Sequence, residues 1–548
     1  MIDRRGGDGM DGWKKVGNVL QGAITALFGI LMLCILFATV ALDRNIDNPF
    51  ANTVRFDNAA YYLAALAMLC GLFCLFCLRP ARLRSNDRRM TRRGYYCALV
   101  LTAVAVAVLQ FFIARWMPLQ TKYYRSDYRY TMRAAWNLAH GGSLEGYSYF
   151  RMSPNNLNIT ILLSLVYRLL PELRATVWLG ALLTNASAVL ASLGVYNVTG
   201  REDVALATGV VGEILVALTW RAFIVYTDNY GMIFVALMLW VCTTRIRPAI
   251  KVPLMTFFAV MASYIKVTNL VVFAAVAANG LIGWLRSDGR GLNIRRMALY
   301  AGCTVVMFGA MFGLQNPIRE HYGFKPGPYP KGWQFMFMVG QTNQTIGTTG
   351  GNNNGIRNDY IKKYKDLDRI NRAFFQRGIN RIRRRGVLGN IVFYEKKIDV
   401  AFNDGYFTNV QPSSMKDMDR SALYDLYIRE GRFYQLGATL FQILWDGILA
   451  IMMLYAALDA WRFRRRHSKA PAGACAWEPA HADGTDRMVT LLKIAILAIV
   501  LFLMLFEGRA KYLYMFMPVF LMAFGLMLHR IFDLFSRALP GIPGELQR

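Results

Sequence analysis

Long apolar stretches separated by short polar turns occupy most of the chain between residues 17 and 531. A helix needs about 20 apolar residues to cross about 30 Å of hydrocarbon, so this pattern predicts an all-α polytopic membrane protein. We expect about twelve transmembrane helices, with approximate bounds at 17–42, 58–78, 94–116, 174–197, 203–222, 228–245, 250–264, 268–286, 296–315, 436–462, 488–506 and 511–531. The first stretch is too long for the core of a cleaved signal peptide, which indicates a membrane anchor.

The segment 155–170 is apolar but short, because asparagines interrupt its start and Pro171 follows its end. Lys and Arg accumulate in cytoplasmic loops, and this rule decides whether the segment 155–170 spans the bilayer. If the segment spanned the bilayer, the basic turns 245–251 and 286–296 would lie outside. If it is a juxtamembrane or re-entrant helix, both turns lie inside, as do the other basic loops. We therefore predict that 155–170 does not span and that both termini are cytoplasmic.

Two loops then lie on the extracytoplasmic side. Loop 117–173 is expected to contain juxtamembrane helices, the first at about 128–140. Loop 316–435 is long enough for a small, mostly helical extracytoplasmic domain, with a charged helix at about 358–385. The chain thus divides into a cytoplasmic tail with two added spans (1–93), a membrane core (94–315), this outer domain (316–435), the C-terminal spans (436–531) and a cytoplasmic tail (532–548).

The formal net charge is +29, which in a soluble protein would suggest a nucleic-acid partner. No nucleic-acid-binding motif accompanies the charge. The basic clusters instead fit cytoplasmic loops beside anionic lipid head groups, so we expect the lipid bilayer as a partner and no nucleic acid. None of the eight cysteines lies in the two outer loops, so disulfides are not expected.

Asp127 lies in the first outer loop, in the sequence Ser126-Asp127-Tyr128-Arg129-Tyr130. One interpretation is that it caps the following helix. The other depends on the lysines and arginines that surround it, on the side of the membrane where positive charge is normally scarce. A carboxylate in a cationic field stays ionised and accepts a proton from a hydroxyl, while the cations hold a phosphate. This pairing favours transfer from a phosphate leaving group.

A second carboxylate, Asp228, also begins a predicted helix on the outer side, where it is either a helix cap or a partner of Asp127. Lys266 lies in a break between two apolar halves, where it either holds a phosphate or extends to the membrane interface. Further candidates lie in the stretch 149–156 and in the turn before the last span, and they are Tyr149, Asn155, Asn156, Glu507, Arg509, Lys511 and Tyr512. Turn formation, or an ion pair between Glu507 and Arg509, is the alternative explanation for them.

The order of these motifs along residues 94–531 resembles the order found in the C-type glycosyltransferases. This membrane superfamily includes protein O-mannosyltransferases and lipid A aminoarabinose transferases. The chain is similar to bacterial family-39-like members of unassigned substrate. Asp127 matches the family's Asp in the first outer loop, 149–156 loosely matches its Tyr-x-x-x-Pro-Asn-Asn-like stretch, and Asp228 matches its second acid. Lys266 matches its mid-chain lysine, and 404–407 matches a late Asp-Gly-x-Phe.

A Glu-x-x-Arg-Tyr-Leu turn of the family corresponds to 507–513, with Lys511 at the usual Arg position. Charge is kept there, but bidentate binding of a phosphate is not.

The resemblance implies an inverting glycosyltransferase of the plasma membrane. It would move a sugar from a polyprenyl-phosphate donor to a glycan, lipid or protein acceptor on the extracytoplasmic face. Asp127 is the implied general base, Asp228 is a second catalytic acid that orients Asp127 or the acceptor, and the donor phosphate is held by Lys266, Arg509 and Lys511. The implied substrate-binding residues are Arg129, Tyr149, Asn155, Asn156, Glu507 and Tyr512. Members of this superfamily differ in their use of a divalent metal, and the sequence does not decide between them.

Two other classes of function remain open. A transporter or flippase of a lipid-linked glycan should carry ionisable groups at mid-membrane depth, and Glu213 within 203–222 is the main candidate. A non-catalytic scaffold of the cell envelope would bind polymer through the outer loop, independently of Asp127. Substrate flux without bond cleavage would favour the first class, and donor-independent binding would favour the second.

Overall fold

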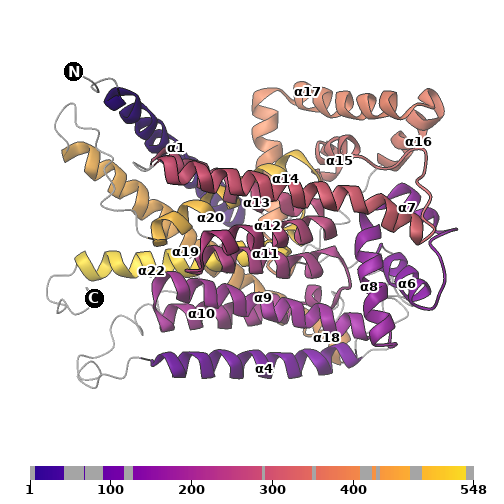
Figure 1. The fold of residues 1–548 in the computed structure, drawn as a ribbon, viewed down its shortest axis with the longest axis horizontal. Helices are drawn as coiled ribbons and strands as arrows, with labels where there is room; N and C mark the ends of the chain where they lie inside the picture. The colour runs from indigo at the N-terminus through magenta and orange to yellow at the C-terminus, as the bar shows by residue number, and fades with distance from the viewer. Residues whose placement is uncertain are drawn as a thin grey trace.

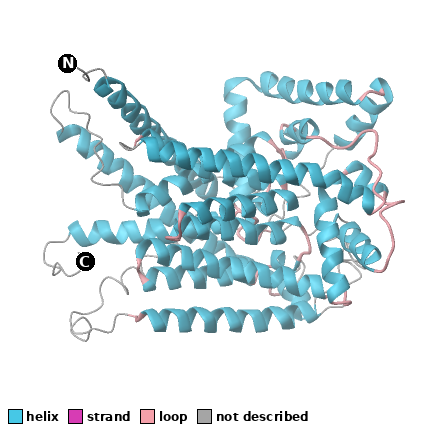
Figure 2. Ribbon diagram, viewed as in Figure 1, coloured by secondary structure: helices cyan, strands magenta, loops and turns pink. Residues whose placement is uncertain are grey.

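The computed structural model describes residues 6–41, 67, 90–116, 127–286, 290–347, 353–407, 422–427, 432–469 and 484–538 (Figure 1). Within these ranges the ordered elements are helices, and no strand is present (Figure 2). The predicted span 58–78, apart from Ala67, lies outside the described residues, as does most of the basic loop that follows it.

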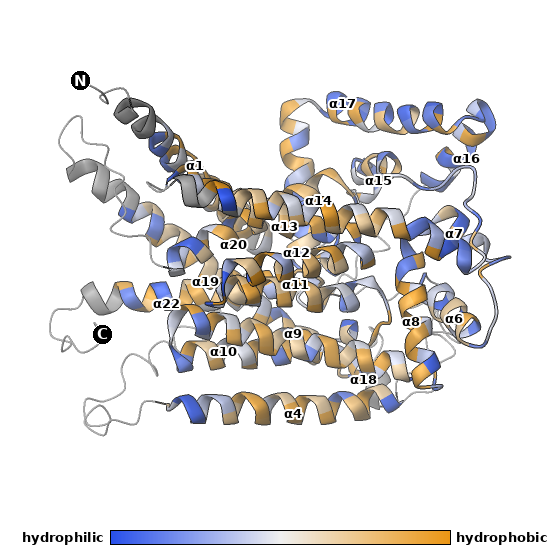
Figure 3. Cartoon of the chain, viewed as in Figure 1, coloured by the Kyte–Doolittle hydropathy of each residue, from blue (hydrophilic) through white to orange (hydrophobic). Residues whose placement is uncertain are grey.

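Nine helices in the described part of the chain are long and apolar enough to cross a membrane. They lie in α1 (Gly6–Ala41), α4 (Arg92–Trp116), α9 (Ala175–Thr199), α12 (Pro248–Ile265), α13 (Leu270–Leu285), α14 (Arg290–His321), α19 (Tyr434–Lys469), α20 (Gly484–Leu505) and α22 (Met517–Ala538). Figure 3 shows hydrophobic colour along the middle of these helices and hydrophilic colour near many of their ends. The structure thus confirms the prediction of an all-α, multi-pass type of membrane protein.

Two of the predicted spans are shorter in the structure. The stretch 203–222 is divided among α10 (Glu202–Gly212), the π-helical turn η2 (Glu213–Ala217) and the 3-10 turn η3 (Trp220–Phe223), and α11 (Thr227–Thr243) has 17 residues. The break before α11 has a local cause, because Asn229 donates to the carbonyls of Arg221 at 2.9 Å and Ala222 at 2.7 Å. These bonds close a tight turn in place of a continuous helix. The count of twelve spans stays a prediction.

The segment 155–170 forms α8 (Leu157–Leu169), a helix of 13 residues. At 1.5 Å per residue it extends about 20 Å, too short to cross the hydrocarbon. It packs against α6 (Asp127–Ala139), which confirms the helix predicted at about 128–140. The short α7 (Ser148–Met152) and the 3-10 turn η1 (Pro154–Asn156) connect them, and Figure 1 shows the three α-helices together at one end of the bundle.

The central helix of the bundle is α9, which packs against α4, α10, α11 and α22. Small residues permit this close approach. A Cβ added to Gly212 would lie 2.9 Å from the Cβ of Ala188 and 2.9 Å from Cδ1 of Leu521. In lipid, such close van der Waals packing replaces the hydrophobic effect as the force that holds helices together.

The segment between α14 and α19, which was predicted to lie outside and is called the outer segment, contains α15 (Trp333–Gly340), α16 (Asn353–Tyr364), α17 (Leu367–Phe402) and α18 (Ala422–Tyr427). The prediction of a single charged helix at 358–385 was wrong, because α16 ends and α17 begins within this range. Lys365 has a φ of 49°, and Asp366 caps α17 by accepting from the amide of Arg369 at 2.8 Å. α17 bends at Gly386 and ends in the core, where Phe402 stacks on Trp445.

Two short turns complete the elements that position the site. The 3-10 turn η4 (Val267–Asn269) joins α12 to α13, and α21 (Ala510–Tyr514) lies between α20 and α22.

Candidate functional site

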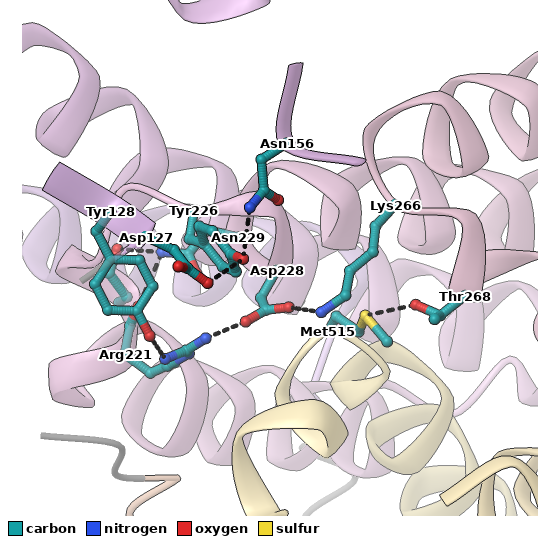
Figure 4. A network of polar contacts seen from close by, with 11 residues as sticks. Asp127, Tyr128, Asn156, Arg221, Tyr226, Asp228, Asn229, Lys266, Thr268 and Met515 are labelled. Carbon is teal, nitrogen blue, oxygen red and sulfur yellow. Dashed lines mark hydrogen bonds and ion pairs between the residues drawn. The ribbon is translucent and has the colours of Figure 1, made fainter. Parts of the chain in front are cut away.

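Asp228 lies at the beginning of α11 and is completely buried. One carboxylate oxygen pairs with the guanidinium of Arg221 and the other with the ammonium of Lys266 (Figure 4). Removing charges from water is costly, so each member of this group depends on the others for compensation. The structure therefore pairs two residues that the sequence analysis singled out, Asp228 and Lys266, and adds Arg221 as the second partner of the carboxylate.

Lys266 occupies the break that was predicted between two apolar halves. α12 ends at Ile265, and the backbone of Lys266 is extended before η4 begins. The carbonyl of Ala262, in the last turn of α12, accepts from the amide of Lys266 at 2.9 Å and from the side chain of Asn269 at 2.9 Å. The side chain of Lys266 points toward Asp228 (Figure 4).

Asp127 lies on the first turn of α6 with its side chain exposed. The hydroxyl of Tyr226 donates to Oδ2 of Asp127 at 3.3 Å and accepts from Nδ2 of Asn156 at 3.1 Å. The next residue, Tyr128, accepts from Nη1 of Arg221 at 3.0 Å. The two sets of contacts meet at the rings of Tyr128 and Tyr226, which lie edge to face with 4.8 Å between centroids (Figure 4).

Tyr149 and Asn156, two predicted substrate-binding residues, lie beside Asp127. Asn156 hydrogen-bonds the hydroxyl of Tyr149, whose ring stacks on Tyr130 with 4.8 Å between centroids. Burial, and then the negative charge of Asp127, raise the pKa of Tyr149 well above its usual value, so this hydroxyl stays protonated. Tyr149 is therefore a hydrogen-bonding group here, and not a base.

The other two residues predicted for the first loop are more peripheral. Asn155 donates to Oδ1 of Asn156 at 3.3 Å. Arg129 is half-buried and forms no hydrogen bond or ion pair with the described residues.

The turn between α20 and α22 brings the last group of predicted residues to the same place. Glu507 is buried and hydrogen-bonds Tyr512. Nζ of Lys266 lies 4.9 Å from the centroid of the Tyr512 ring, and Nζ of Lys511 lies 4.8 Å from it. Arg509 lies within electrostatic range of Tyr512 and Lys511. Two ammonium groups therefore contact one aromatic ring.

Lys331 is a further cation, which the sequence analysis missed. Its amide donates to the carbonyl of Met152 at 2.9 Å, which ties the loop before α15 to the end of α7. Burial lowers the pKa of the Lys331 side chain, while Asp127 and Glu507 act in the opposite direction. Lys331 thus lies within electrostatic range of an acid on α6 and an acid in the turn before α21.

Lys397 on α17 fixes the turn that carries Glu507. Its ammonium is completely buried. It donates to three backbone carbonyls, those of Gly340 at 2.7 Å, Met504 at 2.9 Å and Phe506 at 2.5 Å. The amide of Gly508 donates to the carbonyl of Gly347 at 3.1 Å. These bonds attach the end of α20 to the outer segment and so position Glu507.

Lys397 is expected to make the stability of the protein depend on pH. Burial lowers the pKa of Lys397 to about 7, against an ordinary value of 10.5. Between these two values the unfolded chain binds a proton that the folded chain does not, so the free energy of unfolding rises with pH. The thermal unfolding midpoint should therefore increase as the pH rises above 7, and Lys397→Met should remove this increase. Lys396→Met, at the exposed neighbouring position, is the control and should keep it; a normal increase in Lys397→Met would contradict the assignment.

Gly340 is a second point of contact between the outer segment and the turn after α20. A Cβ at this position would lie 2.4 Å from the backbone carbon of Phe506. Gly340→Ala is expected to lower the free energy of unfolding by about 1–3 kcal/mol, because backbone must shift to make room. The thermal unfolding midpoint in detergent measures this. Gly302→Ala is the control, since nothing lies within 4 Å of a Cβ there, and equal effects would argue against the close contact.

Several residues of this site escaped the sequence analysis. The sequence contains a signal that could have identified Arg221. An arginine in an apolar run requires an acidic partner, and Asp228 lies seven residues later. Tyr226 stands two residues before Asp228 but was not singled out. Lys331 and Lys397 carried no local signal, because their partners are distant in the chain.

Among the described residues, no group of three or more His, Cys, Asp and Glu side chains is arranged to hold a metal ion. Comparison of the chain with protein-family models, with curated proteins and with solved structures finds no match. What the protein does is therefore inferred from its own residues.

Proposed function

We propose that the protein is an integral-membrane glycosyltransferase that moves a sugar from a polyprenyl-phosphate donor to an acceptor hydroxyl, with inversion at the sugar. The observation that carries this proposal is the exposed carboxylate of Asp127 together with two lysines that contact the Tyr512 ring. Lys331 connects the two groups, since it lies within electrostatic range of both Asp127 and Glu507. Transfer from a phosphate leaving group needs a proton acceptor and a site for the departing charge. The order of motifs that resembles C-type glycosyltransferases supports the same reaction.

Asp127 is the proposed general base, because an acceptor hydroxyl has access to its exposed carboxylate. The hydroxyl gives its proton to Asp127 while its oxygen forms a bond to the anomeric carbon. The bond from that carbon to the phosphate oxygen breaks, and polyprenyl phosphate leaves with the electron pair. A single displacement of this kind inverts the anomeric configuration.

Lys266 and Lys511 are the proposed ligands of the departing phosphate, with Arg509 as a third cation. Cations held in place before the reaction stabilise charge as it develops, and the contacts of both lysines with Tyr512 support this role. Asp228 is completely buried and paired, so we assign it a positioning role toward Lys266. Neighbouring predicted residues would then bind the sugar or the acceptor, and these are Arg129, Tyr149, Asn155, Asn156, Glu507 and Tyr512.

We place this site on the extracytoplasmic face of the plasma membrane, with both termini cytoplasmic. Asp228 begins α11, whereas Arg245 and Arg247 follow its other end, and Arg286 follows the far end of α13. Because Lys and Arg concentrate on the cytoplasmic side, the end of the bundle that carries Asp228 faces outward.

A transfer assay with the purified protein in nanodiscs tests the proposed function. It uses radiolabelled polyprenyl-phosphate sugars as donors, and membrane lipids, polysaccharide and proteins as acceptors. We expect release of polyprenyl phosphate and transfer of the label from at least one donor. Retention of all label on every donor, with every acceptor, would contradict a glycosyltransferase.

Glu213 favours a second candidate, a transporter or flippase of a lipid-linked glycan. It is completely buried in the π-helical turn η2, and neither carboxylate oxygen has a hydrogen-bond partner among the described residues. Ionisable groups buried at membrane depth mark transport pathways, and π-helical turns are frequent at functional sites. Flux of a lipid-linked glycan across proteoliposomes without bond cleavage, lost in Glu213→Gln, would support this candidate.

A further inference from the structure

α17 changes direction at Gly386, whose φ of 62° and ψ of −172° are not helical. The positive φ favours glycine, which lacks the Cβ that would clash there. Figure 1 shows a long limb before the bend and a shorter limb, after it, that leads toward the bundle. The bend therefore places the residues on either side of Gly386 at a corner of the molecule.

Four aliphatic side chains at this corner are strongly exposed. They are Val387, Leu388, Ile391 and Val392, which are 79%, 78%, 60% and 54% exposed. Their spacing places them on one face of the short limb, whereas Phe393 and Lys397 lie buried on the other face. Exposure of such a contiguous apolar patch to water is unfavourable and marks a surface that something covers.

Cations adjoin this aliphatic face. Arg383 and Arg384 precede the bend and are exposed, and Lys396 is exposed one turn after Val392. None of these three forms an ion pair within the described ranges of the chain. Aliphatic residues bordered by unpaired cations are the composition of segments that lie in the head-group region of a bilayer, because the cations attract anionic lipid.

The short limb is fixed to the ends of membrane spans, which sets its depth. Lys397 donates to the carbonyls of Met504 at 2.9 Å and Phe506 at 2.5 Å, where α20 ends. The limb also packs against α1, with Glu395 within electrostatic range of Cys34. Phe37, near the same end of α1, is itself exposed. The corner therefore lies close to the level at which α1 and α20 leave the hydrocarbon.

We propose that the corner formed by Arg383, Arg384, Val387, Leu388, Ile391 and Val392 is a site for anionic phospholipid of the outer leaflet. The four aliphatic side chains enter the boundary between acyl chains and head groups, and the two arginines bind lipid phosphate. This membrane contact is independent of the reaction at Asp127, and it holds the outer segment at a fixed height above the bilayer.

Photo-crosslinking in nanodiscs tests this site. A benzoylphenylalanine probe is placed at Leu388 and, as a matched control, at Gln376, which is exposed on the long limb. In phosphatidylglycerol nanodiscs, intact-mass measurement should show phospholipid adducts for the probe at Leu388 and few for the probe at Gln376. Adducts to a second copy of the chain in place of lipid, or equal lipid adducts at both positions, would overturn the proposal.

The role of the arginines is tested with the probe kept at Leu388. Arg383→Gln and Arg384→Gln should each lower the yield of phosphatidylglycerol adducts by about fivefold, since each cation near a membrane surface contributes about 1 kcal/mol. Adducts in phosphatidylcholine nanodiscs should decrease less, because this lipid carries the phosphate but no net negative charge. An unchanged yield of phosphatidylglycerol adducts in both variants would contradict binding of lipid phosphate, and elution of the variants at the wild-type position establishes that they are folded.

Discussion

Asp127→Asn is expected to lower the rate of glycosyl transfer by about 10²- to 10⁴-fold, the usual contribution of a general base, while the protein still folds and inserts. The amide accepts the hydrogen bond that Tyr226 donates at 3.3 Å, but it does not take up a proton from an acceptor hydroxyl. The side chain is exposed and belongs to no buried ion pair, so its neutralisation leaves the packing of α6 unchanged. The measurement is release of polyprenyl phosphate by wild type and variant at equal concentration in nanodiscs.

Glu145→Gln is the matched control for this loss of charge. Glu145 is exposed in the same outer loop, and its ion pair with Lys325, at 2.8 Å, is also exposed. This variant should keep normal activity. Near-normal turnover by Asp127→Asn would contradict the assignment of Asp127 as the general base. Equal losses of transfer activity in both variants would indicate a general effect of charge on the outer loop.

Asp228→Asn is expected to lower the free energy of unfolding by about 3–5 kcal/mol, because it leaves the buried charge of Arg221 and the partly buried charge of Lys266 without a compensating acid. Both pairs are present in the structure, and Arg221 and Asp228 are completely enclosed. The variant should show a large decrease in the thermal unfolding midpoint in detergent. Any loss of transfer activity in this variant would then follow from displacement of Lys266.

The partly exposed pair of Arg201 and Asp203 provides the comparison for Asp228→Asn. Their distance is 2.5 Å, but both side chains are about one-third exposed, and such pairs contribute about 0–1 kcal/mol. Asp203→Asn should therefore barely change the unfolding midpoint. Similar small changes in both variants would show that the charges around Asp228 are compensated in another way.

The sequence predicts much of this fold because spans depend on local composition. Apolar stretches near 94–116, 174–197 and 488–506 become α4, α9 and α20, and the break at Lys266 was predicted from its neighbours. The division of 203–222 was not predicted, because Asn229 closes that turn from outside the stretch. Hydropathy averages over such specific hydrogen bonds.

The candidate site was predictable only in part. The structure brings Asp228, Lys266 and Tyr512 together, as their motifs suggested. Tyr128, which follows Asp127 in the chain, and Arg221, which pairs with Asp228, are 93 residues apart. No periodicity or spacing reveals a contact over such a separation, so residues whose importance lies in distant partners escape an analysis of one sequence.

The position of Lys397 in the chain has a consequence for biosynthesis. Two of its acceptors, at Met504 and Phe506, are 107 and 109 residues further along. As the ribosome proceeds, domains assemble from the N-terminus, and the ion pairs around Asp228 need only residues up to 266. The tyrosine ring that Lys266 contacts arrives with the final hairpin of spans. A nascent chain halted before residue 484 thus holds a neutralised acid but lacks Tyr512 and Lys511, and the last insertion step is the one that completes the proposed site.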